Sequence, residues 1–198
     1  MRQKPTRRAQ EDAYNRFVRS LKKSAWREVL RLTDVRNLAS YGVQKEIDRI
    51  LESNERMAFS EENVYVLVES IFLNRGAILQ QCVVEAFDLM TRYYDENRVH
   101  VEGWKTNDAW KVNRRVVLPR VVSVTFSGSG YVSYGNSRQN LNDIDRAMAF
   151  LEGKKLESVP RTAVCALEEH FKECGDDFSG VLFESTYFEM RCYKKGTL

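Results

Sequence analysis

The feature that most constrains this chain is a helical period running through most of its first half. Between about residues 10 and 94, apolar side chains recur three or four residues apart, which places them on one face of an α-helix. This spacing predicts helices over about 10–32, 43–51, 60–72 and 77–94, with a short helix or turn at 33–38. Ser60 marks one start clearly, because a serine caps free N–H groups and the following Glu61 and Glu62 face the positive end of the helix dipole.

The pattern changes near Asp95. The stretch "KVNRRVVLPRVVSVTF" is rich in β-branched residues and predicts strand, although Pro119 excludes a central strand at that point. "SGSGYVSYGNSRQN" predicts a loop or hairpin. Two helices and a strand follow, over 142–153 (beginning at Asn142 or Asp143), 162–174 and 183–193. The sequence therefore predicts an α+β fold, with a helical N-terminal half followed by a small antiparallel sheet with two helices.

We expect a single α+β domain over 1–198, with its helical part at about 10–95 and its sheet-containing part at 96–198. Residues 1–9 are basic and polar, and we expect them to be disordered. Near the other end, Lys194-Lys195-Gly196 predicts a hairpin turn in which Gly196 takes a positive φ. Thr197 and Leu198 would open the return strand.

Composition excludes several classes of protein. Hydrophobic residues make up 43% and charged residues 30% of the chain, so it can bury a core and is not intrinsically disordered. No apolar run is long enough to cross a membrane, and the N-terminal residues lack the apolar segment of a secretory signal. The four cysteines show no CxxC spacing, which argues against a zinc site and favours a reducing cytoplasm. We expect no cofactor and no metal.

Basic residues gather beside two tryptophans in the middle of the chain. Lysine and arginine side chains near aromatic rings can hold a nucleic-acid backbone and stack bases. An alternative is an edge strand that charge protects from aggregation. Residues 1–50 are also basic, with 13 Lys and Arg against 6 Asp and Glu. This excess indicates a phosphate-facing surface, a solvated helix face or a face that complements an acidic one. The residues of the central cluster are Lys111, Arg114, Arg115, Arg120, Trp104 and Trp110.

Motifs for catalysis are incomplete. The residues from Phe126 to Gly130 match the FxGxG pattern of adenine-specific methyltransferases, with Asp143 or Asp145 placed to hold a ribose. The chain has no Pro-Pro for the downstream motif of those enzymes, so a glycine-containing hairpin loop is the better interpretation. Glu152-Gly153-Lys154 has the letters of a nuclease motif at a predicted helix end. His170 is interpreted as a surface or half-buried helix residue.

Five segments, in order, resemble the bacterial and phage domain-of-unknown-function 4942 family, from about Trp26 to the last residue. Larger relatives in that family join this domain to an adenine-specific DNA methyltransferase domain, and smaller ones stand alone on mobile elements. The resemblance also implies a further strand carrying a histidine, and a C-terminal helix, after the turn at residues 194–196. The sequence has neither, so we expect either a chain truncated at its C-terminus or a departure from the family there. The segments are "AWREVLRLTDVRNLAS", "FSEENVYVLVESIFLNRGAILQQCVVEAFDLM", "TNDAWKVNRRVVLP", "NDIDRAMAFLEGK" and "YFEMRCYKKGTL".

Three hypotheses follow. The first is a non-catalytic accessory domain that associates with nucleic acid and works with a DNA methyltransferase, with Lys194 and Lys195 joining the central cluster on DNA phosphates. The second is a protein–protein interaction module, which would expose an apolar patch. The third is a nuclease or toxin-like hydrolase, which would require convergence of Asp143, Glu152, Lys154 or His100.

Overall fold

The periodic half of the sequence folds into helices, and the described part of the rest combines short strands with two further helices. The computed structural model describes residues 6–53, 58–101 and 110–198. The chain divides into two units, Met1–Ile78 and Leu79–Leu198, with the division inside a helix. The α+β class with a helical first half is confirmed. The helices are α1 (Arg7–Leu32), α2 (Val35–Leu38), α3 (Tyr41–Ser53), α4 (Glu61–Leu73), α5 (Arg75–Thr91), α6 (Ser137–Leu151) and α7 (Ala163–Cys174), with short 3-10 turns at Asp95–Asn97 and Leu156–Ser158.

Side-chain caps fix where the helices of the first unit begin. The Thr6 hydroxyl accepts a hydrogen bond from the Ala9 N–H, so α1 begins at Arg7, within the segment expected to be disordered. Residues 1–5 of that segment lie outside the described residues. The Ser60 hydroxyl accepts from the Asn63 N–H, which confirms the predicted start of α4.

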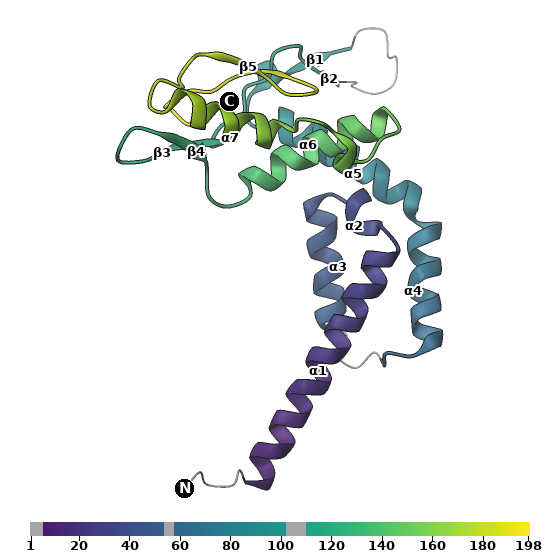
Figure 1. Ribbon diagram of the computed structural model, residues 1–198. Helices are drawn as coiled ribbons and strands as arrows, with labels where there is room; N and C mark the ends of the chain where they lie inside the picture. Colours follow the sequence, from purple (N-terminus) through teal and green to yellow (C-terminus); the bar gives the residue numbers. More distant parts are fainter. Residues whose placement is uncertain (1–5, 54–57, 102–109) are drawn as a thin grey trace, which may run out of the picture. The chain divides into compact units, whose positions relative to one another are not determined.

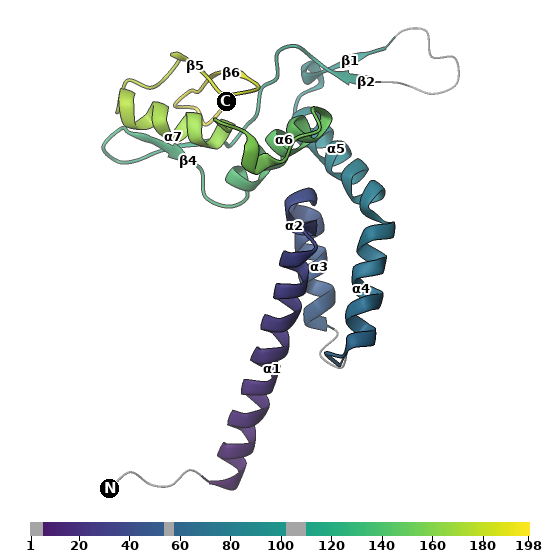
Figure 2. The same ribbon diagram turned by 45° about the vertical axis from the view of Figure 1, so that its right-hand side comes forward.

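The first unit packs around the C-terminal half of α1. Trp26 and Leu30 are buried there, and Figures 1 and 2 show α3 running antiparallel beside this half of the helix. An Arg36–Asp48 ion pair joins α2 to α3. The Gln44 amide donates to the carbonyl of Ala39, which closes the connection between the two helices.

In the described part of the second unit, the strands form three antiparallel ribbons of two strands each. Between the strands β3 (Val122–Val124) and β4 (Gly130–Val132), a turn at 125–129 is closed by the Thr125 N–H, which donates to the Ser129 carbonyl. The FxGxG-like segment is thus a hairpin turn, as the hairpin interpretation predicted. The strands are β1 (Arg98–His100) with β2 (Trp110–Val112), β3 (Val122–Val124) with β4 (Gly130–Val132), and β5 (Leu182–Glu184) with β6 (Glu189–Arg191).

Two local predictions in this unit are wrong. The single strand expected over 183–193 is a hairpin, because the chain reverses where the Ser185 N–H donates to the Phe188 carbonyl. The helix expected from Asn142 or Asp143 begins earlier, at Ser137, so that Leu141 and Asp143 lie in its interior and are buried. The predicted limits of α7 are confirmed by the cap at Thr162 and the end at Gly175.

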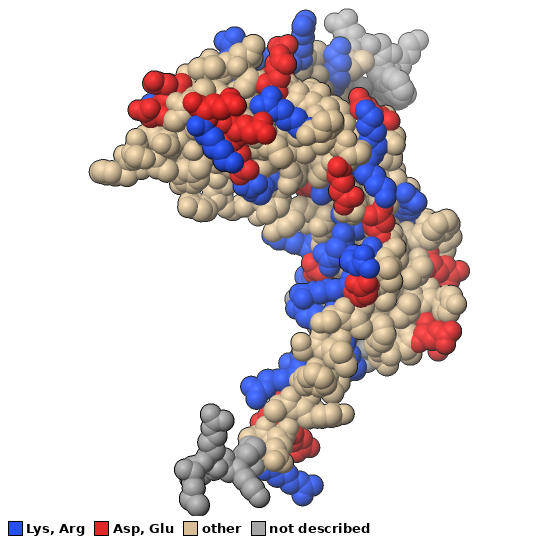
Figure 3. Space-filling model, in the orientation of Figure 1, with Lys and Arg blue, Asp and Glu red and all other residues tan. Residues whose placement is uncertain are grey.

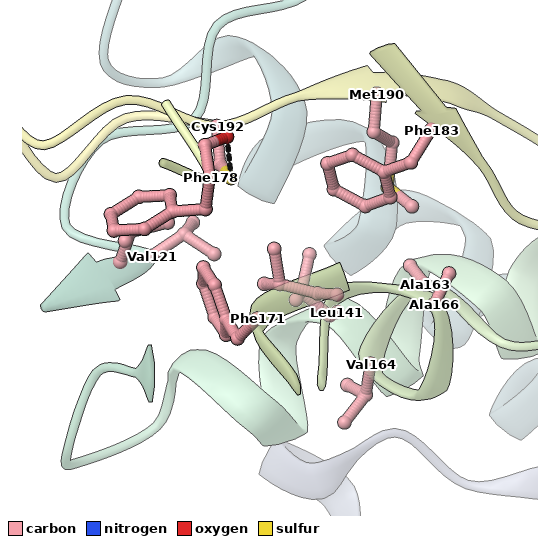
Figure 4. Close-up of a cluster of buried hydrophobic side chains, with 12 residues drawn as sticks. Val121, Leu141, Ala163, Val164, Ala166, Phe171, Phe178, Phe183, Met190 and Cys192 are labelled. Atoms are coloured by element: carbon pink, nitrogen blue, oxygen red, sulfur yellow. Dashed lines mark hydrogen bonds between the residues drawn. The ribbon is translucent and has the colours of Figure 1, made fainter. Parts of the chain in front are cut away.

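The core of the second unit lies between α7 and the ribbons. Phe171 of α7 meets Phe178 edge to face, with ring centroids 5.1 Å apart. Figure 4 shows these two rings on one side of the cluster and Phe183 with Met190 on the other. Gly130 of β4 lies directly against the Phe171 ring, because an added Cβ would come within 2.4 Å of a ring carbon.

The close approach at Gly130 predicts a steric cost. We expect Gly130→Ala to lower the free energy of unfolding by about 1–3 kcal/mol, the range for overpacking a filled core. Urea unfolding followed by circular dichroism measures the change. Gly76→Ala in α5 is the control, because nothing lies within 4 Å of a Cβ added at that position. A Gly130→Ala protein as stable as the wild type would contradict the packing described here.

Candidate nucleic-acid interface

Trp110 and Lys111 lie on β2 of the first ribbon, where both side chains are exposed. The guanidinium of Arg98 on β1 lies 4.8 Å from the centre of the Trp110 ring. His100 meets the same ring edge to face at 5.2 Å. The ribbon therefore presents an aromatic ring with a cation stacked on it. Sequence reasoning missed Arg98, because its pairing with Trp110 depends on the register between the two strands.

Arg114 and Arg115 follow this ribbon on a segment held by one buried amide. Asn97 donates from its side-chain nitrogen to the carbonyls of Met90 and Val117, at 2.7 and 2.8 Å. Its side-chain oxygen accepts from the Val117 N–H at 2.9 Å. The Asn97 carbonyl also accepts from the Asn113 N–H at 2.8 Å. Asn97 thus fixes both ends of the segment that carries the two exposed arginines.

Arg120 is brought beside the C-terminal lysine turn by backbone hydrogen bonds. Leu118 and Leu198 exchange N–H and carbonyl groups at 2.9 and 3.0 Å. The Gly196 carbonyl accepts from the N–H groups of Val121 and Val122. Gly196 has φ of +92°, as the predicted turn requires. Lys194, Lys195 and Arg120 are all exposed.

The lysine and arginine residues predicted to bind nucleic acid therefore form two groups on the second unit. Lys111, Arg114 and Arg115 lie around the Asn97 anchor, whereas Arg120, Lys194 and Lys195 lie around Gly196. Trp104 lies outside the described residues. On the face shown in Figure 3, cations and acids are interspersed over this unit, so any attraction for phosphate would come from local groups of cations.

The candidate hydrolase residues Asp143 and Glu152 pair with different cations, and His100 lies against Trp110 of the first ribbon. Asp143 is buried and forms an ion pair with Arg146. Glu152 bonds Lys154 at 2.8 Å and accepts from the Tyr187 hydroxyl at 3.2 Å. Asp143 and Glu152 are nine residues apart along α6, which corresponds to about 13 Å of helix. Over the described ranges, no group of three His, Cys, Asp or Glu side chains is arranged to hold a metal ion.

Asp145 serves the fold rather than a ribose. Its carboxylate accepts from the Ala163 N–H at 2.6 Å, at the start of α7. The side chain is fully buried, and its second oxygen has no hydrogen-bond partner. Burial raises the pKa of the Asp145 carboxyl to about 6, with the Ala163 N–H acting in the opposite direction.

His170 is buried, which corrects the interpretation of it as a surface or half-buried residue. Its ring stacks on Phe183, with centroids 4.2 Å apart. Nε2 lies 2.8 Å from the Phe178 carbonyl, which can only accept, so Nε2 carries the proton and donates. Nδ1 is then the acceptor for the Cys174 thiol at 3.5 Å. The period of α7 alone gave no signal for these contacts.

A protein-family comparison identifies the chain. The model of the family described as "Domain of unknown function (DUF4942)" matches residues 18–198. The chain belongs to this family. No curated protein and no solved structure matches it significantly. Within the described part of the chain, none of the helices combines the length and apolar character needed to span a membrane.

The Asn97 anchor can be tested by removing its amide. We expect Asn97→Ala to lower the free energy of unfolding by about 2–4 kcal/mol, because it leaves the buried Met90 carbonyl and the part-buried backbone groups of Val117 without these partners. Hydrogen exchange of the Val117 amide should accelerate more than exchange within α7. Asn113→Ala is the control, because its side chain makes exposed hydrogen bonds. Unchanged exchange at Val117 would show that the anchor is not needed.

The raised pKa of Asp145 predicts a pH-dependent stability. The protonated carboxyl contributes stability that is fully present below about pH 4, which is the pKa of the group in the unfolded chain. This contribution is lost as the pH rises through about 6, which is the pKa of the group in the folded protein. Asp145→Asn keeps an oxygen for the Ala163 N–H and does not titrate. Between pH 4 and pH 7.5 we expect the variant to gain about 3 kcal/mol relative to the wild type, from two pKa units.

Urea unfolding at both pH values measures this gain. Asp177→Asn, which removes an exposed carboxylate from the same unit, is the control for the loss of one negative charge. A constant difference between wild type and Asp145→Asn across the pH range would exclude a raised pKa.

Proposed function

We propose that this DUF4942 protein is a non-catalytic accessory domain that binds nucleic acid and works with a DNA methyltransferase. The observation that supports the proposal is that exposed lysine and arginine side chains stand on backbone segments that hydrogen bonds hold in place. Arg114 and Arg115 follow the Asn97 anchor, and Arg120 lies beside the Lys194–Lys195 turn. Cations on a fixed backbone lose less conformational freedom when they bind phosphates than cations on a free loop.

Each kind of residue has a role in this proposal. Lysine and arginine side chains neutralise phosphates and position the strand without reading its sequence. Trp110 offers a ring face for stacking an unpaired base, in competition with the Arg98 guanidinium that now covers it. The methyltransferase link is supported by the family resemblance. A cytoplasmic location agrees with the free cysteines, Cys82, Cys165, Cys174 and Cys192, in the described part of the chain.

Fluorescence anisotropy with labelled duplex and single-stranded DNA tests the proposal. We expect the affinity for both to fall steeply between about 50 and 200 mM salt, because cations bound to phosphates displace counterions. Arg114→Ala with Arg115→Ala should weaken binding further and reduce the salt slope by about two, because two phosphates are then no longer neutralised.

The matched control is Lys155→Ala with Lys172→Ala. This pair removes the same charge from exposed positions elsewhere on the second unit. Equal reductions in affinity in the two double variants would mean that net charge, rather than the anchored arginines, drives binding. No binding at 50 mM salt would contradict the proposed function.

A further inference from the structure

The β3–β4 hairpin turns one face to the core of the second unit and the other face away from it. Side chains alternate between the two faces along a strand, and Ser123 pairs with Tyr131 in the register, so these two lie on the outward face. The hydroxyl groups of Ser123 and Ser133 are hydrogen-bonded at 2.8 Å, which places Ser133 on the same face. The residues packed against the core are Val122, Val124 and Val132.

Tyr131 of β4 and Tyr134, which follows the strand, form an aromatic pair. Their ring centroids are 5.3 Å apart, and the ring planes are tilted by 58°. Tyr134 is 87% exposed, whereas Tyr131 is half-buried. Contact with Tyr131 reduces the conformational freedom that the Tyr134 side chain would lose on binding a ligand. This ring differs from that of Trp110, whose face is covered by the Arg98 guanidinium.

The base of the hairpin, formed by residues 120, 121, 133 and 134, carries both Arg120 and Tyr134. The Ser133 N–H donates to the Val121 carbonyl at 2.8 Å, which extends the β3–β4 register by one pair. Arg120 and Tyr134 are the next residues on the two sides of this ladder, and both are exposed. The Ser137 hydroxyl donates to the Arg120 carbonyl at 3.0 Å, which ties the backbone of Arg120 to the segment after Tyr134.

Charge differs between the two ends of this hairpin. Residues 121–137 contain no Asp, Glu, Lys or Arg, and the projecting end of the hairpin is uncharged in Figure 3. Asp176 lies against the turn, because a Cβ added at Gly128 would come within 3.3 Å of its Cβ. At the base, the Gly196 carbonyl accepts from the Val121 N–H at 2.9 Å and brings the exposed Lys194–Lys195 turn to the edge of β3. Phosphates are therefore attracted to the base rather than to the turn.

We propose that the base of the hairpin binds single-stranded nucleic acid, with an unpaired base stacked on Tyr134 and the adjoining phosphates held by Arg120 and Lys195. The inference rests on the proposed function and names the form of its ligand. An aromatic ring can stack a base of any sequence, and neighbouring cations follow the backbone of the strand. The base of this hairpin supplies both kinds of contact on one hydrogen-bonded piece of backbone.

The same features favour a single strand over a duplex or a protein. Each base of a duplex is stacked between its neighbours, and unstacking it costs free energy that an unpaired base does not require. Lysine is depleted at protein interfaces, and the centre of such an interface is apolar. Here two lysines lie at the edge of β3, and the valines of both strands face the core.

Fluorescence anisotropy with an oligothymidylate of about 12 nucleotides, and with a duplex of the same length, tests the inference. We expect Tyr134→Ala to weaken binding of the single strand about tenfold or more, because the ring on which a base stacks is lost. The salt dependence should stay that of the wild type, because no charge is removed. Tyr134→Phe keeps the ring and should bind as the wild type does. An oligouridylate of the same length distinguishes DNA from RNA as the source of the strand.

Phe126→Ala is the matched control, because Phe126 is a fully exposed ring of the same hairpin, in the turn that Asp176 lies against. We expect this variant to bind the single strand like the wild type, and all three variants to bind duplex equally. Circular dichroism checks that each variant is folded. An oligonucleotide that carries 5-iodouracil, cross-linked by light, locates the stacked base, and we expect the adduct on Tyr134 or Tyr131.

The inference and the proposed function fail in different ways. A wild-type chain that binds both DNAs, with single-strand affinity unchanged in Tyr134→Ala, would overturn the inference and leave the proposed function intact. Equal losses in Tyr134→Ala and Phe126→Ala, or an adduct on Trp110 in place of the tyrosines, would have the same meaning. A wild-type chain that binds neither DNA at about 50 mM salt would contradict the inference and the proposed function together.

Discussion

The carbonyl oxygen of Phe178 joins the helix and the ribbons of the second unit. It accepts from His170 of α7 at 2.8 Å and from the Cys192 thiol at 3.9 Å, just after β6. The Gly180 N–H donates to the Cys192 carbonyl, which ties the same turn to the end of β6. The chain then continues into the lysine turn that holds residues 118–122. The position of Arg120 relative to that turn thus depends on contacts made at Phe178.

Two-stranded ribbons are marginally stable alone, so each ribbon here depends on contacts outside its own strands. The strands of β5 and β6 each bury a central side chain, Phe183 and Met190, against α7. The β1–β2 ribbon has no buried strand residue in its described part, and Asn97 ties its base to the end of α5 instead. This difference explains why the ribbon with Trp110 and Lys111 can expose nearly all of its side chains. Only Val112 at the base of this ribbon packs against the core of the unit, whereas Trp110 and Lys111 stay exposed.

Local signals in the sequence were sufficient to predict where the capped helices begin, as at Ser60 and Thr162. Such caps depend only on backbone groups a few residues away. The hairpin within 183–193 has no Gly, Pro or Asn at its turn, so nothing local indicated a reversal. The sequence predicted which residue types make up the candidate site, but it did not predict how they are arranged. The basic residues are visible in the sequence, whereas the role of Asn97 depends on Val117, twenty residues away. Such contacts follow from packing of the whole unit, and single residues in polar loops carry no spacing that reveals them.

Charge divides unequally between the two units, and this bears on how nucleic acid would be approached. Residues 79–198 contain 16 Lys and Arg against 17 Asp and Glu, whereas residues 1–78 contain 15 against 11. Under the proposed function, long-range attraction would come from the first unit and would change the association rate. The anchored cations of the second unit would act at contact distance and change dissociation.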